Sequence, residues 1–211
     1  MTEFNHKSVL LSECTEGLAI KPNGIYVDGT LGGGGHSAAI LKQLGGSGHL
    51  IGIDRDGDAL EAAEKKIAPL AKPYTLIRDK HENMRQVLEG LSVQAVDGFL
   101  LDLGVSSYQL DKPERGFSYR YDSPLDMRMD NRDNLSAYDI VNRYPEKELA
   151  HIIKSYGEER YAKRIASALC YKRTEKPIET TFELSKIFFG KSCTGVTGPA
   201  SSKIFSASTT T

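Results

Sequence analysis

The sequence is poor in cysteine and has no long apolar run. Its three cysteines, Cys14, Cys170 and Cys193, are widely separated and lack metal-ligand spacing, which argues against a disulfide framework and against a metal centre. We interpret them as packing residues in a reducing, cytoplasmic setting. No stretch reaches the length of a membrane span and no basic-then-apolar leader pattern is visible. We therefore expect no membrane partner and no bound metal.

An excess of positive charge, the usual sign of a nucleic-acid partner, is also missing, because the formal net charge is −1. The charge is nevertheless uneven. Residues 1–142 hold 15 Lys and Arg against 21 Asp and Glu, whereas residues 143–211 hold 12 against 7. An acidic part would suit a cationic cofactor and a basic part a polyanion. An ordinary solvated helix surface explains the basic part equally well.

What the sequence does contain is an alternation of strand and helix patterns. The 211 residues are 39% apolar, enough for one sizeable core. Apolar runs predict strands at 25–27, 49–53, 74–77 and 96–102, and helical spacing predicts helices at 37–44, 59–68 and 84–91. This order is typical of an α/β fold with a parallel sheet and right-handed crossovers.

A run of glycines, Gly32 to Gly35, separates the first strand from its helix. Strand, glycine turn and helix form the usual loop for a nucleotide cofactor, because glycine lets a ligand approach the main chain and the helix start offers unpaired N–H groups. A plain flexible turn is an equally common reason for such a run.

Acidic residues end three of the predicted strands, at Asp28, Asp54 and Asp102. Ligands bind at the carboxyl ends of parallel strands, so we expect the three to converge on one crevice. An acid at the end of the second strand is placed to bind both hydroxyls of a ribose. We prefer this role for Asp54 over the alternative of a helix N-cap.

Beyond Leu103 a long polar and aromatic loop leads into a helical region. Ser136 with Asp139 predicts one capped helix, and Thr180 with Glu183 predicts another. Residues 158–172 are amphipathic, with one apolar face made of Ala162, Ile165, Ala166 and Leu169. Residues 191–211 are rich in Ser, Thr and Gly and are interpreted as a disordered or aberrant tail.

Several motifs, taken together and in order, resemble those of the bacterial ribosomal small-subunit RNA (cytosine-N4) methyltransferases, the RsmH or MraW family. They are Asp28-Gly-Thr-Leu-Gly-Gly-Gly-Gly-His36, Asp102-Leu-Gly-Val-Ser-Ser107, Glu114-Arg-Gly-Phe-Ser118, Pro124-Leu-Asp-Met-Arg-Met-Asp130 and Tyr156-Gly-Glu-Glu-Arg160. The resemblance implies transfer of a methyl group from S-adenosylmethionine to the N4 amine of a cytidine in the decoding region of small-subunit ribosomal RNA.

The resemblance also implies the site. Cofactor-binding residues by this comparison are Gly34, Gly35, His36, Asp54, His81, Asp102 and Gln109. His81 stands where the family has a phenylalanine, and Tyr108 stands where it has a proline. Asp102 is our candidate catalytic residue, since a carboxylate that accepts the amine N–H would activate a poor nucleophile. A purely cofactor-binding role for Asp102 is the alternative.

The expected architecture is an incomplete Rossmann-like sheet of the class I S-adenosylmethionine-dependent type with an inserted helical substrate domain. We predict a cofactor-binding domain over 1–104, an RNA-facing insert over 105–190 and the tail over 191–211. The Asp/Ser-Pro-Pro-aromatic motif of DNA amino-methyltransferases is absent, so DNA is not an expected substrate. The family continues with further strands past residue 190, and we therefore expect impaired activity.

Two other function classes remain open. A nicotinamide-dependent oxidoreductase shares the strand, glycine and acid arrangement, but the spacing Gly-x-Gly-x-x-Gly is missing. A non-catalytic remnant that binds cofactor or RNA without turnover is the second alternative.

Overall fold

The computed structural model describes residues 8–188. Its strands are β1 (Ile25–Asp28), β2 (His49–Asp54), β3 (Tyr74–Arg78) and β4 (Gly98–Leu100). The α-helices are α1 (Leu11–Gly17), α2 (Gly35–Gln43), α3 (Gly57–Ile67), α4 (Met84–Gly90), α5 (Ser107–Asp111), α6 (Ala137–Arg143), α7 (Glu146–Ser155), α8 (Ala162–Glu175) and α9 (Thr181–Phe188). Short 3-10 turns are η1 (Ala68–Leu70), η2 (His81–Asn83) and η3 (Pro113–Arg115).

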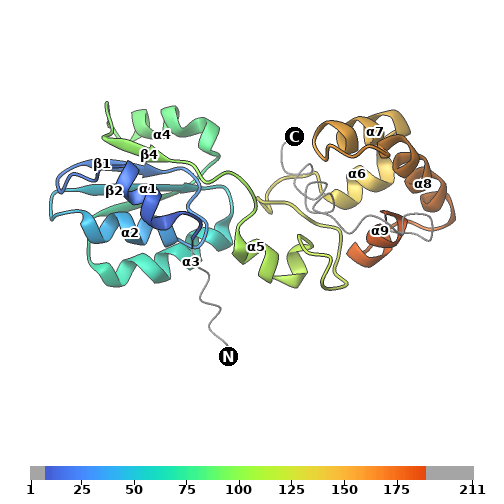
Figure 1. Cartoon of the computed structure of the whole chain (residues 1–211), viewed down its shortest axis with the longest axis horizontal. Coiled ribbons are helices and arrows are strands. Elements are labelled where there is room, and N and C mark those ends of the chain that lie inside the picture. Colours follow the sequence, from blue (N-terminus) through green and yellow to red (C-terminus); the bar gives the residue numbers. More distant parts are fainter. Residues whose placement is uncertain (1–7, 189–211) are drawn as a thin grey trace. The chain divides into compact units, whose positions relative to one another are not determined.

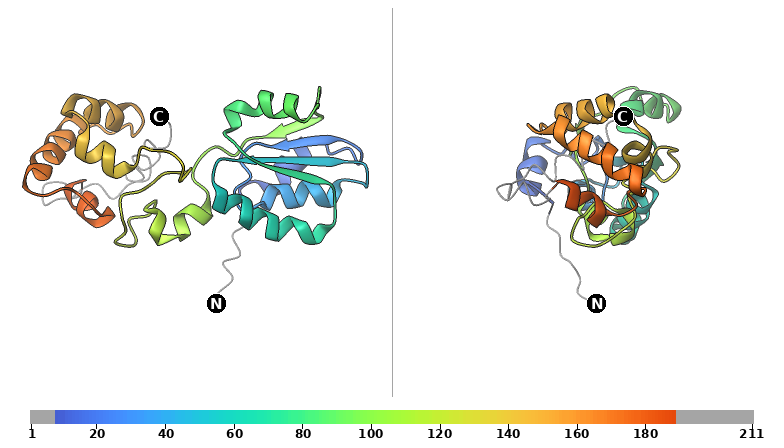
Figure 2. Two further views of the ribbon diagram at one scale, coloured as in Figure 1. Left: turned by 180° about the vertical axis from the view of Figure 1, so that it is seen from behind. Right: turned by 90° about the vertical axis from the view of Figure 1, so that its right-hand side faces the viewer.

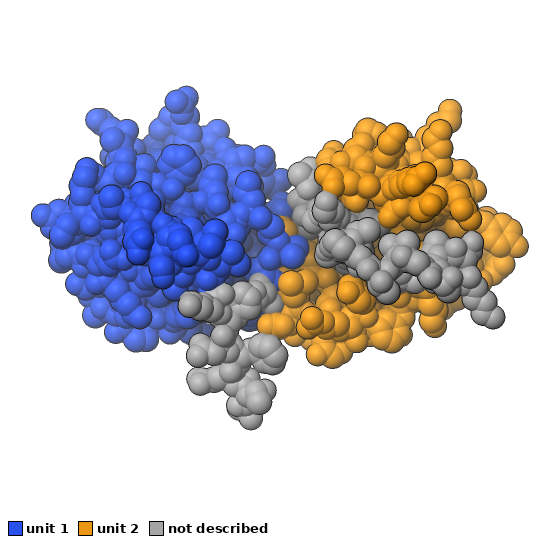
Figure 3. Space-filling model, in the orientation of Figure 1, with its two compact units in different colours: residues 1–108 blue, residues 109–211 orange. Residues whose placement is uncertain are grey.

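The chain divides into two compact units, one up to Tyr108 and one from Gln109 onward (Figure 3). The predicted division into a cofactor-binding domain and an RNA-facing insert concerns function as well as packing, and it stays a prediction. The predicted tail over 191–211 lies outside the described residues.

Unit 1 holds the parallel sheet, as the sequence predicts, with strand order β3-β2-β1-β4. Helices α2 and α3 cover one face and α4 the other (Figures 1 and 2). Strand residues alternate between these faces, because successive side chains of a strand point in opposite directions. Tyr26 and Leu50 pack with α2, whereas Val27 and Ile51 pack with α4.

The fourth strand is shorter than predicted. The pattern predicts 96–102, but β4 ends at Leu100, so Asp102 lies two residues past the strand. The reason is its environment: β4 pairs only with β1 among the described strands, and Phe99 and Leu101 are exposed. An edge strand has hydrogen-bond partners on one side only, which limits its length.

Unit 2 is a group of helices that local sequence signals delimit well. Ser136 and Asp139 form a reciprocal capping box at the start of α6, and Thr180 and Glu183 form the predicted one at α9. The predicted apolar face of α8 is buried, at Ala162, Ile165, Ala166 and Leu169. The helix begins at Ala162 and not at Glu158, because Glu158 has a positive φ of 52° that a right-handed helix does not allow.

Arg173 on α8 joins two of these helices. Its guanidinium donates hydrogen bonds to the carbonyls of Val141 and Tyr144, at 2.7 Å each. These carbonyls lie at the end of α6, where helix carbonyls lack partners within the helix. A cation there satisfies them and also interacts favourably with the helix dipole.

Among residues 8–188, no helix is long and apolar enough to cross a membrane. In the same part of the chain, no group of His, Cys, Asp and Glu has the arrangement of a metal site. Cys14 and Cys170 are free and partly buried. Cys193 lies outside the described residues.

Candidate cofactor site at the carboxyl ends of the strands

The sheet order has a switch point between β1 and β4. The chain proceeds from β1 outward to β2 and β3, then crosses to β4 on the other side of β1. Loops after β1 and β4 therefore diverge at this point, and ligands in such sheets bind there. The glycine run and Asp102 follow these two strands.

Asp54 is fixed by backbone donors on both oxygens. Its Oδ2 accepts the N–H of Gly32 at 2.8 Å and its Oδ1 accepts the N–H of Asp56 at 2.9 Å. The carboxylate thus holds the glycine loop in place, and its remaining lone pairs suit hydroxyl donors. Burial raises the pKa of Asp54, while the two N–H groups oppose the shift.

The alternative role of Asp54 as a helix N-cap is wrong. The N-cap of α3 is Asp56, whose side chain accepts the N–H of Asp58 at 3.1 Å. Asp54 belongs to the last position of β2. Because Asp56 caps α3, the carboxylate of Asp54 does not serve as the cap, and it accepts the N–H of Gly32 in the glycine loop.

Asp28 differs from the expectation that all three acids line one crevice. Its side chain is fully buried, with an exposed fraction of 0%. Oδ2 accepts the hydroxyl of Ser37 at 2.6 Å, and Oδ1 accepts the N–H of Thr30 at 3.2 Å. Burial raises the pKa of Asp28, and the bond from Ser37 opposes this. Asp28 therefore ties β1 to α2 and does not present its carboxylate to a ligand.

Asp102 is held through its backbone and leaves its carboxylate available. Its N–H donates to Oγ1 of Thr30 at 2.6 Å. This bond connects the loop after β4 to the loop after β1, across the switch point. Among residues 8–188, the carboxylate of Asp102 has no hydrogen-bond or ion-pair partner, and the residue is exposed. That arrangement suits a group that accepts a proton or a hydrogen bond from a ligand.

Neighbouring atoms lie so close to the backbone at positions 29 and 34 that only glycine fits there. A Cβ at Gly29 would lie 2.6 Å from Cδ2 of Leu101 and 3.6 Å from Cβ of His81. His81 therefore lies next to the end of β1, although it begins η2, after β3. Gly34 has a φ of 71°, and a Cβ there would lie 2.9 Å from Cβ of Ala63. Only glycine fits both constraints at position 34.

His36 is turned into the protein. The residue is 6% exposed, and Nε2 of its ring lies 3.0 Å from the carbonyl oxygen of Val9. At Gly35, a Cβ would collide with Ser8. The segment 8–10 is thus laid against the start of α2. The predicted cofactor contacts of Gly34, Gly35 and His36 stay predictions, and this packing is what the structure adds.

Gln109 belongs to unit 2, where it is buried with 4% exposure. Its predicted place beside Asp102 stays a prediction. Sequence reasoning missed Thr30 and Ser37, which hold Asp102 and Asp28 respectively. Their only signal is that small hydroxyl residues stand beside acids at the ends of strands, a pattern too common to be specific.

Comparisons with known proteins identify the family of the chain. The model of the MraW methylase family matches residues 3–201. The chain belongs to this family. Membership favours a methylase and leaves no support for the nicotinamide-dependent alternative, and a methylase needs a methyl donor.

Similar proteins include two called ribosomal RNA small subunit methyltransferase H. One, from Lachnospira eligens, is 56% identical over 88% of this chain and 59% of its own length. The other, from Clostridioides difficile, is 52% identical over 86% of this chain and 58% of its own length. The chain thus spans less than two thirds of these relatives. A solved rRNA-methylase chain from Clostridium thermocellum matches with 27% identity and a TM-score of 0.35, covering 38% of this chain and 48% of that one.

Proposed function

We propose that the chain binds S-adenosylmethionine at the carboxyl ends of β1, β2 and β4. The observation that carries this proposal is the hydrogen bond from the N–H of Gly32 that joins Asp54 to the glycine loop, with the N–H of Asp56 holding the other carboxylate oxygen. The carboxylate of Asp54 thereby positions the main chain of the glycine loop, which carries no side chains. Its remaining lone pairs can accept hydrogen bonds from the two hydroxyls of a ribose. Gly34, Gly35 and His36 would lie against the cofactor, and the imidazole of His81 would stack on its adenine.

The residues present fit such a group. A Cβ at Gly33 would meet nothing within 4 Å among the protein atoms, so the space beside this glycine is open. The backbone N–H groups at the start of α2 are donors for a carboxylate or hydroxyl. Asp102 supplies an exposed anion near the switch point, which suits a ligand that carries positive charge.

We propose that the reaction is methylation of the N4 amine of a cytidine. When bound, S-adenosylmethionine would supply a methyl group on a positively charged sulfur, and the electron pair of the broken sulfur–methyl bond would stay on the sulfur, which leaves as a neutral thioether. Cytosine N4 is a poor nucleophile because its lone pair is delocalised into the ring. Asp102 would accept an N–H of this amine, return electron density to the nitrogen and take the proton. Its backbone bond to Thr30 holds it between the two loops that surround the reacting atoms.

The substrate we propose is RNA of the small ribosomal subunit, at its decoding region, with no role for DNA. The names of the relatives support small-subunit ribosomal RNA, and the family resemblance of the sequence motifs implies the decoding region. A substrate of this kind places the protein in the cytoplasm. The basic composition of residues 143–211 suits a polyanion, since phosphate contacts supply much of the affinity for nucleic acids.

Transfer of a labelled methyl group to small-subunit RNA tests the activity. With Asp102→Asn we expect kcat to fall about 10²- to 10⁴-fold, the usual contribution of a general base. Glu89→Gln, an exposed carboxylate on α4, is the matched control. A raised KM with unchanged kcat would assign Asp102 to cofactor binding only. Cofactor binding without any transfer would show a remnant that has lost turnover.

A further inference from the structure

The start of α8 carries a group of exposed cations without counterions. Arg160, Lys163 and Arg164 are exposed, and none of them has an ion-pair partner among residues 8–188. Two other cations, near the end of this helix, have partners. Lys172 pairs with Glu175 at 2.6 Å, and Arg173 bonds the carbonyls that end α6. The unpaired cations are therefore concentrated at one end of the helix.

Two of these cations lie over an aromatic ring. The guanidinium carbons of Arg160 and Arg164 are 5.7 Å and 5.8 Å from the centroid of Tyr161. Cation–π distances of this size hold the cations near the ring. Tyr161 remains 43% exposed, so the ring and both guanidiniums face solvent together.

The same face of α8 continues to a second exposed ring. Tyr161, Arg164, Ala168 and Tyr171 are spaced by three or four residues, which places them on one side of a helix. Tyr171 is 70% exposed, and Ala168 between the rings is exposed and small. Ten residues of α-helix rise about 15 Å. We call Arg160, Tyr161, Lys163, Arg164 and Tyr171 the α8 basic-aromatic face.

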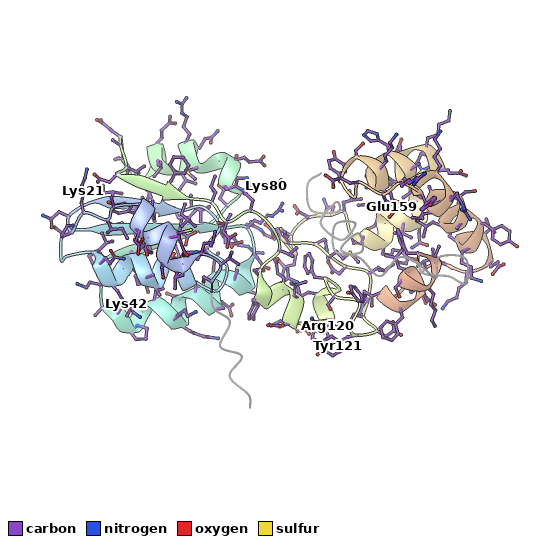
Figure 4. The ribbon with its side chains drawn as sticks, in the orientation of Figure 1. Lys21, Lys42, Lys80, Arg120, Tyr121 and Glu159 are labelled. Atoms are coloured by element: carbon purple, nitrogen blue, oxygen red, sulfur yellow. The ribbon has the colours of Figure 1, made fainter. Side chains whose placement is uncertain are left out.

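Among residues 8–188, Glu159 makes no ion pair with the cations of this face. Glu159, labelled in Figure 4, accepts the backbone N–H of Tyr161 at 2.8 Å, so its carboxylate is used at the start of the helix. Glu158 is exposed beside it. The inner side of α8 is packed, with Ala166 at 0% exposure, whereas Arg160, Lys163 and Arg164 are exposed.

We propose that the α8 basic-aromatic face binds single-stranded RNA, with its guanidiniums and Lys163 on phosphates and its tyrosine rings stacked on bases. Cations next to exposed rings are the combination that single-strand binding surfaces use. The tyrosine rings could not stack on the bases of a duplex, because those bases are already stacked inside the double helix. This inference rests on the proposed RNA substrate and names the surface that would hold it.

The test is a fluorescence-anisotropy titration of the full chain with a labelled single-stranded RNA from the decoding region. Each phosphate contact adds about 0.7 to the slope of log affinity against log salt for single strands. Arg160→Gln with Arg164→Gln should therefore lower that slope by about 1.4 and weaken binding on the order of 20-fold at about 0.1 M salt. Lys172→Gln with Lys176→Gln removes the same charge from paired lysines and is the matched control.

Stacking is tested separately at one ring. Tyr161→Ala should weaken binding about 5- to 100-fold, and Tyr161→Phe should restore most of the affinity because it keeps the ring. Equal losses in the arginine variant and the lysine control would overturn the proposal, as would an unchanged salt slope or no RNA binding by the unaltered chain. Tyr161→Phe as weak as Tyr161→Ala would overturn the stacking part.

Cofactor binding separates this proposal from the proposed function. S-adenosylmethionine affinity is measured in the arginine variant and should equal that of the unaltered chain, since neither arginine is among the proposed cofactor-binding residues. If the chain binds RNA through the α8 basic-aromatic face but binds no cofactor, the proposed function is refuted and the α8 proposal stands. If cofactor binding and methyl transfer are the same in the arginine variant and in the unaltered chain, the α8 proposal is refuted and the proposed function stands.

Discussion

At the scale of single residues, the site depends on acids whose surroundings differ sharply. Asp28 is enclosed between β1 and α2, Asp54 is tied to the glycine loop and Asp102 is exposed. The three stand at comparable positions in the sequence pattern, at or just after the ends of the first, second and fourth strands. Their roles are therefore set by the groups around them, not by the pattern that identifies them.

Asp28 predicts a pH dependence of stability. Because burial raises its pKa in the folded protein, the folded state binds more protons than the unfolded state above about pH 4, the ordinary pKa of Asp. The free energy of unfolding should therefore fall as the pH rises from about 4 through the raised pKa. Asp28→Asn, which carries no charge, should flatten this fall.

Urea unfolding of both proteins across this pH range measures the effect. Exposed Asp111→Asn is the control, since its carboxylate is not buried. A pH dependence that is the same in Asp28→Asn and in the unaltered chain would contradict the account of Asp28. A steeper fall in Asp28→Asn would contradict it as well.

Gly34 and Gly33 predict a contrast between stability and binding. Gly34→Ala should lose roughly 2–4 kcal/mol of unfolding free energy, because the left-handed backbone and the contact with Ala63 both oppose a Cβ. Gly33→Ala has open space and should change stability by less than about 1 kcal/mol. We expect Gly33→Ala instead to weaken S-adenosylmethionine binding, since its methyl group would occupy the space beside the loop. Thermal unfolding and calorimetry on both variants would show whether the two effects separate.

At the scale of elements, the helix caps depend only on residues that are close together in the sequence. Ser136→Ala removes one side of the capping box of α6 and should cost about 1 kcal/mol of unfolding free energy. Ser167→Ala replaces an exposed serine within α8 and should be neutral or slightly stabilising, because alanine has the higher helix propensity. Chemical denaturation compares the two. Equal effects would show that the capping box is not formed.

The elements also show what could be predicted from the sequence. Both capping boxes, the buried face of α8 and the parallel sheet follow from local spacing, and the structure confirms them. Contacts between distant segments could not be predicted. The bond of Thr30 to Asp102 spans 72 residues and that of His36 to Val9 spans 27. They depend on how loops meet at the sheet end, which no periodicity encodes.

At the scale of the whole molecule, the apolar side chains of β4 and of the segment just after it are only partly covered in residues 8–188. Phe99 in β4 and Leu101 and Leu103 just after it are all exposed, Leu103 by 67%. Edge strands with exposed apolar side chains promote association. Phe99→Lys with Leu103→Lys should therefore reduce concentration-dependent self-association in analytical ultracentrifugation. Leu10→Lys, at another exposed leucine, should leave it unchanged.

The central claim is that Asp54 and the glycine loop form one cofactor site, and calorimetric titration with S-adenosylmethionine tests it most directly. The unaltered chain should bind with saturation, and Asp54→Asn should weaken binding about 10- to 100-fold, the loss of a hydrogen bond to a charged group. Glu61→Gln, an exposed carboxylate on α3, should bind as the unaltered chain does. Saturable binding that is equal in all three proteins, or no binding by the folded chain, would contradict the account.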